Sequence, residues 1–145
     1  MARKKSHTFP IQLITLEDEN YHILIETEFQ HQHKGKWAID TGASKSVFDE
    51  NQKDCYQLSP VLNMDVQSAG IGEMQIETQN GILPVLKLGD LLLNNWPVAI
   101  IDLQYVNKLY EQFTNETIFG LLGSDFLVQH QAKIDYKKLV LTLYF

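Results

Sequence analysis

Cysteine is nearly absent from the sequence, with Cys55 the single example among 145 residues. One thiol cannot form a disulfide within the chain, so nothing in the sequence indicates an oxidising compartment. A secretory signal is not expected either, because the apolar stretch at 11–16 is short, contains a glutamine and runs into three acidic residues. We therefore expect an intracellular, cytoplasmic protein in which Cys55 is a free, buried thiol.

Long hydrophobic runs are also missing. The most apolar stretch, residues 91–101, is interrupted by two asparagines and by Pro97, and it is too short to cross a bilayer as a helix. The sequence thus predicts a soluble protein without a membrane partner.

Positive charge is scarce, with 12 basic against 18 acidic residues and a formal net charge of −6. The one basic cluster, Arg3 to Lys5, falls in residues 1–9, which we interpret as a solvated basic tail. Nucleic acid is therefore not an expected partner. With 44% hydrophobic residues, the chain is long enough for one domain with a real core, which we assign to residues 10–145.

Short strand-like runs dominate what is present. Residues 10–16 and 21–29 are rich in β-branched and aromatic residues and flank an acidic turn, as the arms of a hairpin do. A further strand is expected over residues 36–39, and more strand-like runs follow at 81–89 and 91–102. The pattern predicts an all-β domain with one or two short helices.

Helical structure is expected at three places. Residues 46–54 fit a helical turn with Phe48 on its buried side. Residues 103–114 have a helical apolar period and predict an amphipathic helix. Its apolar residues are Leu103, Val106, Leu109 or Tyr110, and Phe113. A short helix near the C-terminus is expected to open with Ser124 as its N-cap and Asp125 in its first turn.

The stretch WAIDTGAS places Asp40 at the end of an apolar strand, where a carboxylate is costly unless it is used or satisfied. Gly42 allows a backbone conformation closed to other residues and a close approach of chain or ligand. Thr41 and Ser44 add hydroxyls that can hold a carboxylate in one orientation. Such a device suits two carboxylates that share a proton and activate a water between them, one as base and the other as acid.

Three segments together resemble a known family. WAIDTGAS, SAGIGEM and IFGLLGSDFL occur in the order found in the retropepsin-like aspartic proteases, in particular their bacterial single-domain type. The resemblance covers residues 10–145 and implies a half-barrel domain that hydrolyses peptide bonds with water as the nucleophile. It also implies that Asp40 is the catalytic aspartate, that the Thr41 hydroxyl links two active-site loops, and that Gly42 belongs to the catalytic loop.

The same resemblance implies the substrate contacts. Residues 67–76 would form the flap that closes over a bound peptide, and Phe119 to Leu122 the apolar segment behind the active-site loop. The expected substrate-binding residues are Ala43, Ser44, Gly70, Ile71 and Gly72. An extended peptide or protein substrate would pair with strands lining the cleft. Neither a cofactor nor a metal is implied.

A second aspartate is required, and the chain offers two candidates. Asp102 follows an apolar run, and Asp125 follows a glycine turn, but neither has the Thr-Gly that distinguishes Asp40. We expect Asp102 at a strand or helix boundary and Asp125 in a structural role at a helix start. A two-fold homodimer supplies the missing group more simply, because it brings two copies of Asp40 together across one axis.

Other interpretations remain open beside this one. The alternative function is a non-catalytic peptide-binding or dimerisation module of the same fold, because fold and motif do not demonstrate turnover.

His31 and His33 lack a third ligand and are interpreted as part of a solvated turn. Trp37 and Trp96 are expected to be core or interface anchors.

Overall fold

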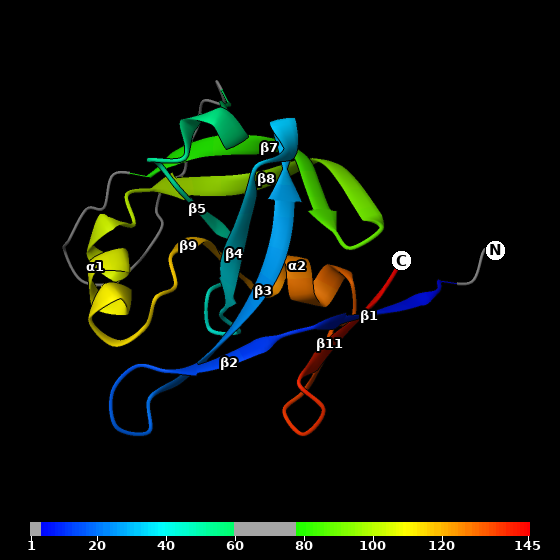
Figure 1. Ribbon diagram of the computed structural model, residues 1–145. Coiled ribbons are helices and arrows are strands. Elements are labelled where there is room, and N and C mark those ends of the chain that lie inside the picture. Colours follow the sequence, from blue (N-terminus) through cyan, green and yellow to red (C-terminus); the bar gives the residue numbers. More distant parts are fainter. Residues whose placement is uncertain (1–3, 60–77) are drawn as a thin grey trace.

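Strands make up most of the chain in the computed structural model, which describes residues 4–59 and 78–145 (Figure 1). The strands are β1 (Ser6–Pro10), β2 (Gln12–Thr15), β3 (Tyr21–Phe29), β4 (Lys34–Ile39), β5 (Val47–Asp49), β6 (Gln57–Leu58), β7 (Gln79–Leu88), β8 (Leu91–Ile101), β9 (Ile118–Leu122), β10 (Lys133–Asp135) and β11 (Val140–Tyr144). The helices are α1 (Gln104–Phe113) and α2 (Ser124–Gln129), with short 3₁₀ turns at Gln30–Gln32 and Lys53–Cys55. The predicted all-β class with few helices is confirmed.

Eight strands form one sheet in the order β2-β3-β4-β9-β5-β8-β7-β6. Strand β3 pairs with β4 along most of its length and with β7 at its end, where Phe29 faces Leu86. This last pairing closes the sheet on itself into a small barrel, where the sequence predicts a half-barrel. Closure is possible because β3 is nine residues long and reaches both neighbours.

The predicted hairpin of residues 10–16 and 21–29 is present. Strands β2 and β3 pair antiparallel from Gln12 opposite Leu24 to Thr15 opposite Tyr21, so the acidic segment between them is the expected turn. Strands β7 and β8 form a second, longer antiparallel pair. Within the described residues, no helix has the length and apolar character needed to span a membrane.

The N-terminal segment is more ordered than a tail. Strand β1 pairs antiparallel with β11, from Ser6 opposite Tyr144 to Pro10 opposite Val140, and β11 also pairs with β10. The backbone of Lys5 adds two hydrogen bonds to Phe145. Residues 6–9 are therefore part of a sheet and not of the predicted solvated tail, because their partner is a strand at the far end of the chain. Figure 1 shows β1 and the C-terminus on one side of the molecule.

Residues 46–54 do not begin as the predicted helical turn. Val47 to Asp49 form β5, which lies between β8, its parallel neighbour, and β9, its antiparallel neighbour. Phe48 is fully buried there, as expected of an inward-facing residue. Pairing with two strands overrides the local helical tendency, and the chain turns only after β5, first at Glu50–Asn51 and then in the 3₁₀ turn Lys53–Cys55.

Aromatic side chains fill the barrel. Trp37 and Phe48 are fully buried, and their rings lie 5.7 Å apart between centroids. Phe29 lies 5.1 Å from Phe48 and stacks on Phe119 at 5.7 Å. Trp37 is thus a core residue, as predicted, and so are Trp96 and Cys55.

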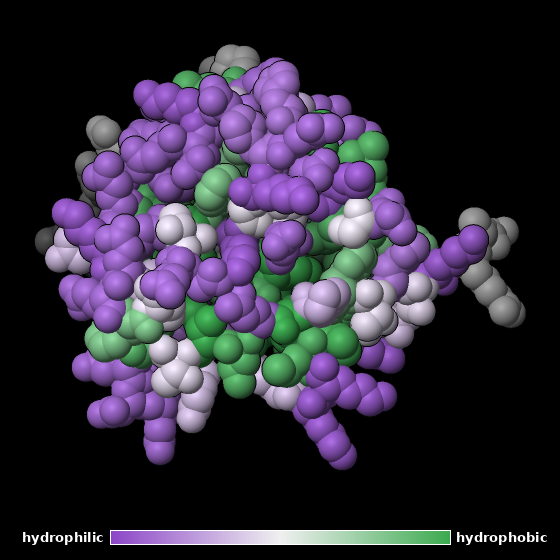
Figure 2. All heavy atoms as spheres, in the orientation of Figure 1, coloured by the Kyte–Doolittle hydropathy of each residue, from purple (hydrophilic) through white to green (hydrophobic). Residues whose placement is uncertain are grey.

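Both predicted helices are present, with corrected details. In α1 the side chain that reaches the core is Tyr110, while Leu109 stays exposed. In α2 the N-cap is Gly123, and Ser124 is the first helical residue and makes no side-chain cap. The surface seen in Figure 2 is polar in its upper half, while hydrophobic residues gather in its lower part, over β2, β3 and β11.

Candidate active site

Strand β4 carries Asp40 to one end of the barrel. Its residues Trp37 to Ile39 pair in parallel with Gly120 to Leu122 of β9. The backbone N–H of Asp40 then donates to the carbonyl of Leu122 at 2.9 Å. Asp40 is half-buried, so its carboxylate is fixed at the end of a buried strand and still accessible. The segment 119–122 lies behind the Asp40 turn, as the sequence predicts.

The turn after Asp40 holds its carboxylate through the backbone. The N–H of Gly42 donates to Asp40 Oδ1 at 3.0 Å, and the N–H of Ala43 donates to the Asp40 carbonyl at 3.1 Å. The φ of Gly42 is outside the left-handed region, so the expected special conformation is not used. A Cβ at this position would lie 3.4 Å from Asp40 Oδ1, which is an ordinary contact.

Thr41 and Ser44 are exposed. Their hydroxyls make no hydrogen bond to other residues of the described chain, so Gly42, not a hydroxyl, orients the carboxylate here. The predicted role of Thr41 between two active-site loops concerns a second copy of the chain and stays a prediction.

Ser46 ties the Asp40 turn to helix α2, a role that was not predicted from the sequence. Its N–H and hydroxyl both donate to Asp125 Oδ1, at 2.9 and 2.8 Å, and its hydroxyl oxygen accepts from the N–H of Gly123 at 2.9 Å. The N–H of Ser124 donates to the carbonyl of Ala43 at 2.7 Å. The one signal for this role in the sequence is a serine shortly after the Asp-Thr-Gly motif. Serine is too common near such a motif for Ser46 to be singled out.

The two other candidate aspartates have structural roles, as predicted. The Asp125 carboxylate accepts hydrogen bonds from Ser46 and from the N–H of Phe126. Asp102 lies between β8 and α1, where it accepts from the N–H of Gln104 and from the side chain of Asn51. These hydrogen bonds, the one from Gln104 first, lower the pKa of Asp102.

Asp40 opens into a cavity of about 470 Å³ between the end of β4, the start of β3 and helix α1. The walls are mainly aromatic and aliphatic, and among the described lining residues Asp40 carries the one carboxylate. They are Tyr21, His22, Ile23, Ala38, Ile39, Asp40, Thr41, Tyr105, Val106, Leu109, Tyr110, Leu121 and Tyr136. The volume is typical of ligand-binding pockets, roughly 300 to 1,000 Å³.

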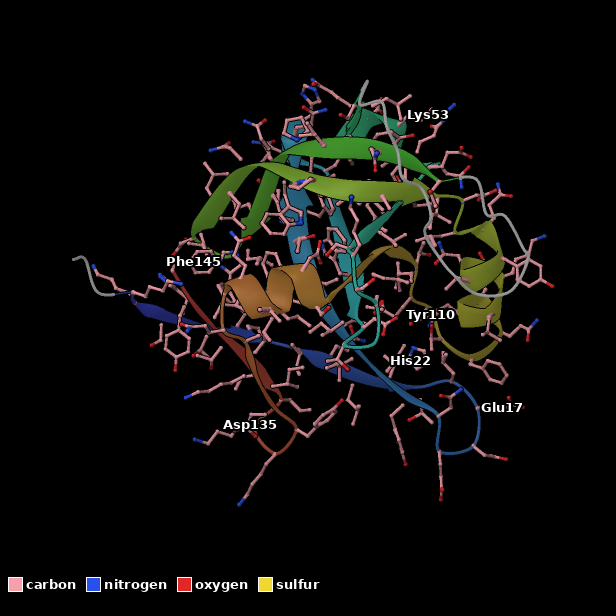
Figure 3. The ribbon with its side chains drawn as sticks, turned by 180° about the vertical axis from the view of Figure 1, so that it is seen from behind. Glu17, His22, Lys53, Tyr110, Asp135 and Phe145 are labelled. Carbon is pink, nitrogen blue, oxygen red and sulfur yellow. The ribbon has the colours of Figure 1, made fainter. Side chains whose placement is uncertain are left out.

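One polar pair lines this cavity besides Asp40 and Thr41. His22 Nδ1 and the Tyr110 hydroxyl lie 2.9 Å apart, where β3 meets α1 (Figure 3). Burial raises the pKa of Tyr110 to about 12, and the negative charge of Asp40 adds to the shift. Tyr110 is therefore a neutral phenol at physiological pH. Neither residue has a functional signal in the sequence, where Tyr110 is expected only as one possible core residue.

The expected flap, residues 67–76, lies outside the described residues, and so do Gly70, Ile71 and Gly72. Ala43 and Ser44 lie three and four residues after Asp40, but neither lines the cavity. In residues 4–59 and 78–145, no group of three or more His, Cys, Asp or Glu side chains is arranged to hold a metal ion.

Comparison with known proteins gives one family. The model of the family described as aspartyl protease matches residues 25–126, which include Asp40, Ser46 and Asp125. A search of curated proteins gives no match.

Two solved structures share the fold. A retropepsin-like aspartic protease from Rickettsia conorii is 16% identical, with a TM-score of 0.50 over 100% of this chain and 97% of that one. The retroviral protease-like domain of Ddi1 from Leishmania major is 17% identical, with a TM-score of 0.51 over 83% of this chain and 86% of that one. At these identities the likeness shows a retropepsin-like fold.

Proposed function

Since the chain belongs to the aspartyl protease family, we propose that it is an aspartic endopeptidase whose catalytic dyad consists of two copies of Asp40 across a homodimer axis. The observation that carries the proposal is the position of Asp40. It is held at the end of a buried strand, oriented by Gly42, and open to a cavity large enough for part of a peptide. Asp102 and Asp125 are engaged elsewhere, which favours a second chain as the source of the partner carboxylate.

In the proposed mechanism, one Asp40 is ionised and takes a proton from a water molecule. The other is protonated and donates a hydrogen bond to the carbonyl oxygen of the peptide bond under attack. The two carboxylates share one proton because like charges at close range cannot both ionise, a behaviour established for aspartic-protease dyads in general. The peptide would bind extended along strand edges near the cavity.

The Asp40→Asn substitution tests the proposal. It keeps the shape of the side chain and removes the acid, so we expect cleavage of a random peptide mixture to fall by at least about 100-fold. Asp90→Asn, in the exposed turn between β7 and β8, is the matched control and should cleave as the wild type does. The products are measured by mass spectrometry.

The alternative is a non-catalytic peptide-binding or dimerisation module of the same fold. Cleavage absent from both the wild type and Asp40→Asn, under conditions where the protein is dimeric, would contradict the endopeptidase and favour that module. Cleavage by both proteins at equal rates would contradict the assignment of Asp40.

A further inference from the structure

The cavity beside Asp40 combines apolar walls with the polar pair His22–Tyr110, which is separate from Asp40 and Thr41. Tyr105 and Leu109 of α1 and Tyr21 of β3 contribute exposed apolar surface at this site. His22 and Tyr110 contribute the pair, with Tyr110 only 1% exposed and His22 half-buried. A ligand group that fits both parts has an apolar body and one polar end.

The direction of the His22–Tyr110 hydrogen bond follows from the hydrogens that each group carries. The Tyr110 hydroxyl is buried from water and has no other acceptor among the described residues, so its proton is best used by donating to His22 Nδ1. In a neutral imidazole the accepting nitrogen carries no hydrogen, and the other nitrogen does. Tyr110 therefore fixes His22 in the tautomer with the proton on Nε2.

This tautomer makes His22 a donor. Its Nε2–H has no acceptor within residues 4–59 and 78–145, and the nitrogen is not sealed in the interior as those of Trp37 and Trp96 are, so it is available to a ligand. The polar end of the ligand must then accept a hydrogen bond. Among protein side chains, tyrosine combines an aromatic body for the apolar walls with a terminal oxygen that accepts.

We propose that this cavity is a substrate subsite for a tyrosine side chain, with His22 Nε2–H donating to the tyrosine hydroxyl and Tyr110 as the positioning residue that fixes the His22 tautomer. The inference rests on the proposed peptidase function for its substrate. Because Asp40 lines the same cavity, the bound tyrosine flanks the peptide bond that is cleaved.

Matched peptide libraries test the subsite. Two libraries carry either tyrosine or phenylalanine at one fixed position and random residues elsewhere, and their affinities for the Asp40→Asn protein are compared, so that no turnover is needed. We expect the tyrosine library to bind about fivefold more tightly, the size of one neutral hydrogen bond. In the wild type, kcat/KM should favour tyrosine by a similar factor, mainly through KM.

Two variants and one control show whether the tyrosine preference depends on the His22–Tyr110 pair. The double variant His22→Phe with Tyr110→Phe replaces both hydrogen-bonding partners by similar apolar rings, so it avoids leaving a buried hydroxyl unpaired. It should bind both libraries equally. His22→Gln keeps an amide N–H near the position of Nε2 and should retain part of the preference. His33→Phe, at an exposed histidine outside the cavity, should leave the full preference.

Equal binding of the two libraries by Asp40→Asn, binding of neither, or a tyrosine preference that survives in the double variant would each overturn the subsite. The outcome is separable from the fate of the endopeptidase. A tyrosine preference in Asp40→Asn with no cleavage by the wild type keeps the subsite and overturns the peptidase. Cleavage by the wild type without a tyrosine preference keeps the peptidase and overturns the subsite.

Discussion

Ser46 is a single, fully buried hydroxyl on which the geometry of the Asp40 turn depends. It joins Asp125 at the start of α2 to the Gly123 N–H. Ser46→Ala leaves the Gly123 N–H without its acceptor, so we expect the free energy of unfolding to fall by about 1–3 kcal/mol. Urea denaturation measures the change. Ser44→Ala, at an exposed position two residues earlier, is the control and should change stability by less than about 0.5 kcal/mol.

Gly120 and Gly42 make a second matched pair at the residue scale. A Cβ at Gly120 would lie 2.7 Å from a ring atom of Trp37 and would also overlap the Val47 carbonyl oxygen, whereas at Gly42 it would make only an ordinary contact. Gly120→Ala should therefore lower the free energy of unfolding by about 1–3 kcal/mol through overpacking. Gly42→Ala should leave it nearly unchanged. Equal denaturation midpoints for the two variants would contradict this difference.

Asp40 was predictable from the sequence because its neighbours form a local pattern. Ser46, Gly120 and Tyr110 were not, because each is defined by a partner far along the chain: Asp125, Trp37 and His22. Gly42 was expected to adopt a special backbone conformation, and this expectation was wrong. A glycine two residues after an aspartate is compatible with both ordinary and left-handed backbone, so the sequence could not decide between them.

Helix α1 is attached to the barrel at its start, in its middle and just beyond its end, which makes it a firm wall for the cavity. At its start, the N–H of Leu103 donates to the buried carboxylate of Asp49 at 3.1 Å. In its middle, Asn107 exchanges two hydrogen bonds with the backbone of Ile118, at 2.8 and 3.0 Å. Beyond its end, Glu116 forms an ion pair with Lys36 of β4. Three separate attachments thus connect α1 to the barrel.

The Glu116–Lys36 pair should make stability depend on pH. The hydrogen bond from Lys36 is the main cause that lowers the pKa of Glu116 below its ordinary value of 4.5. The ionised carboxylate is thus favoured in the folded state, so its contribution is present above the unfolded pKa and is lost as the pH falls through the lowered folded pKa. The wild type should be more stable than Glu116→Gln near neutral pH, and the gap should close in acid.

Urea midpoints of the two proteins, compared over the range from about pH 7 to about pH 3, measure this effect. Asp102, whose pKa is also lowered, is present in both proteins and cancels from the difference. The pair is partly exposed and screened by solvent, so the difference is expected to be small. A constant gap over the whole range would contradict the assignment.

Elements with a local signal were predicted well. The β2–β3 hairpin and helix α1 follow from periodicity and turn composition. Strand β5 was missed because its three residues are extended only through pairing with β8 and β9. Within α1, the choice between Leu109 and Tyr110 as the buried residue could not be made from spacing, because both fit the helical period.

At the scale of the whole molecule, the proposed dyad makes activity a property of two chains. We expect the specific activity to fall on dilution as the dimer dissociates, in parallel with the mass measured by analytical ultracentrifugation. Mixing the wild type with excess Asp40→Asn should inhibit it, because mixed dimers hold one acid. Asp90→Asn in the same excess is the control and should not inhibit. Full activity from a strictly monomeric chain would contradict the shared dyad.

Barrel closure and the N-terminal strand could not be predicted from the sequence, because both depend on partners far along the chain. Phe29 pairs with Leu86, and Ser6 pairs with Tyr144, across long stretches of chain. The residues of one segment do not indicate which distant segment it will pair with. The loop that contains Asp40 and the strand before it could be predicted, because the two are contiguous in the sequence.

The pairing of β1 with β11 also has a consequence for the order of synthesis. In chain order β1 precedes the barrel strands and β11 follows them, so during synthesis β1 has no partner until the barrel strands have been made. The three-stranded sheet of β1, β11 and β10 is then among the last parts to assemble. Any factor that holds back β11 during translation would delay this sheet and leave β1 unpaired beside a formed barrel.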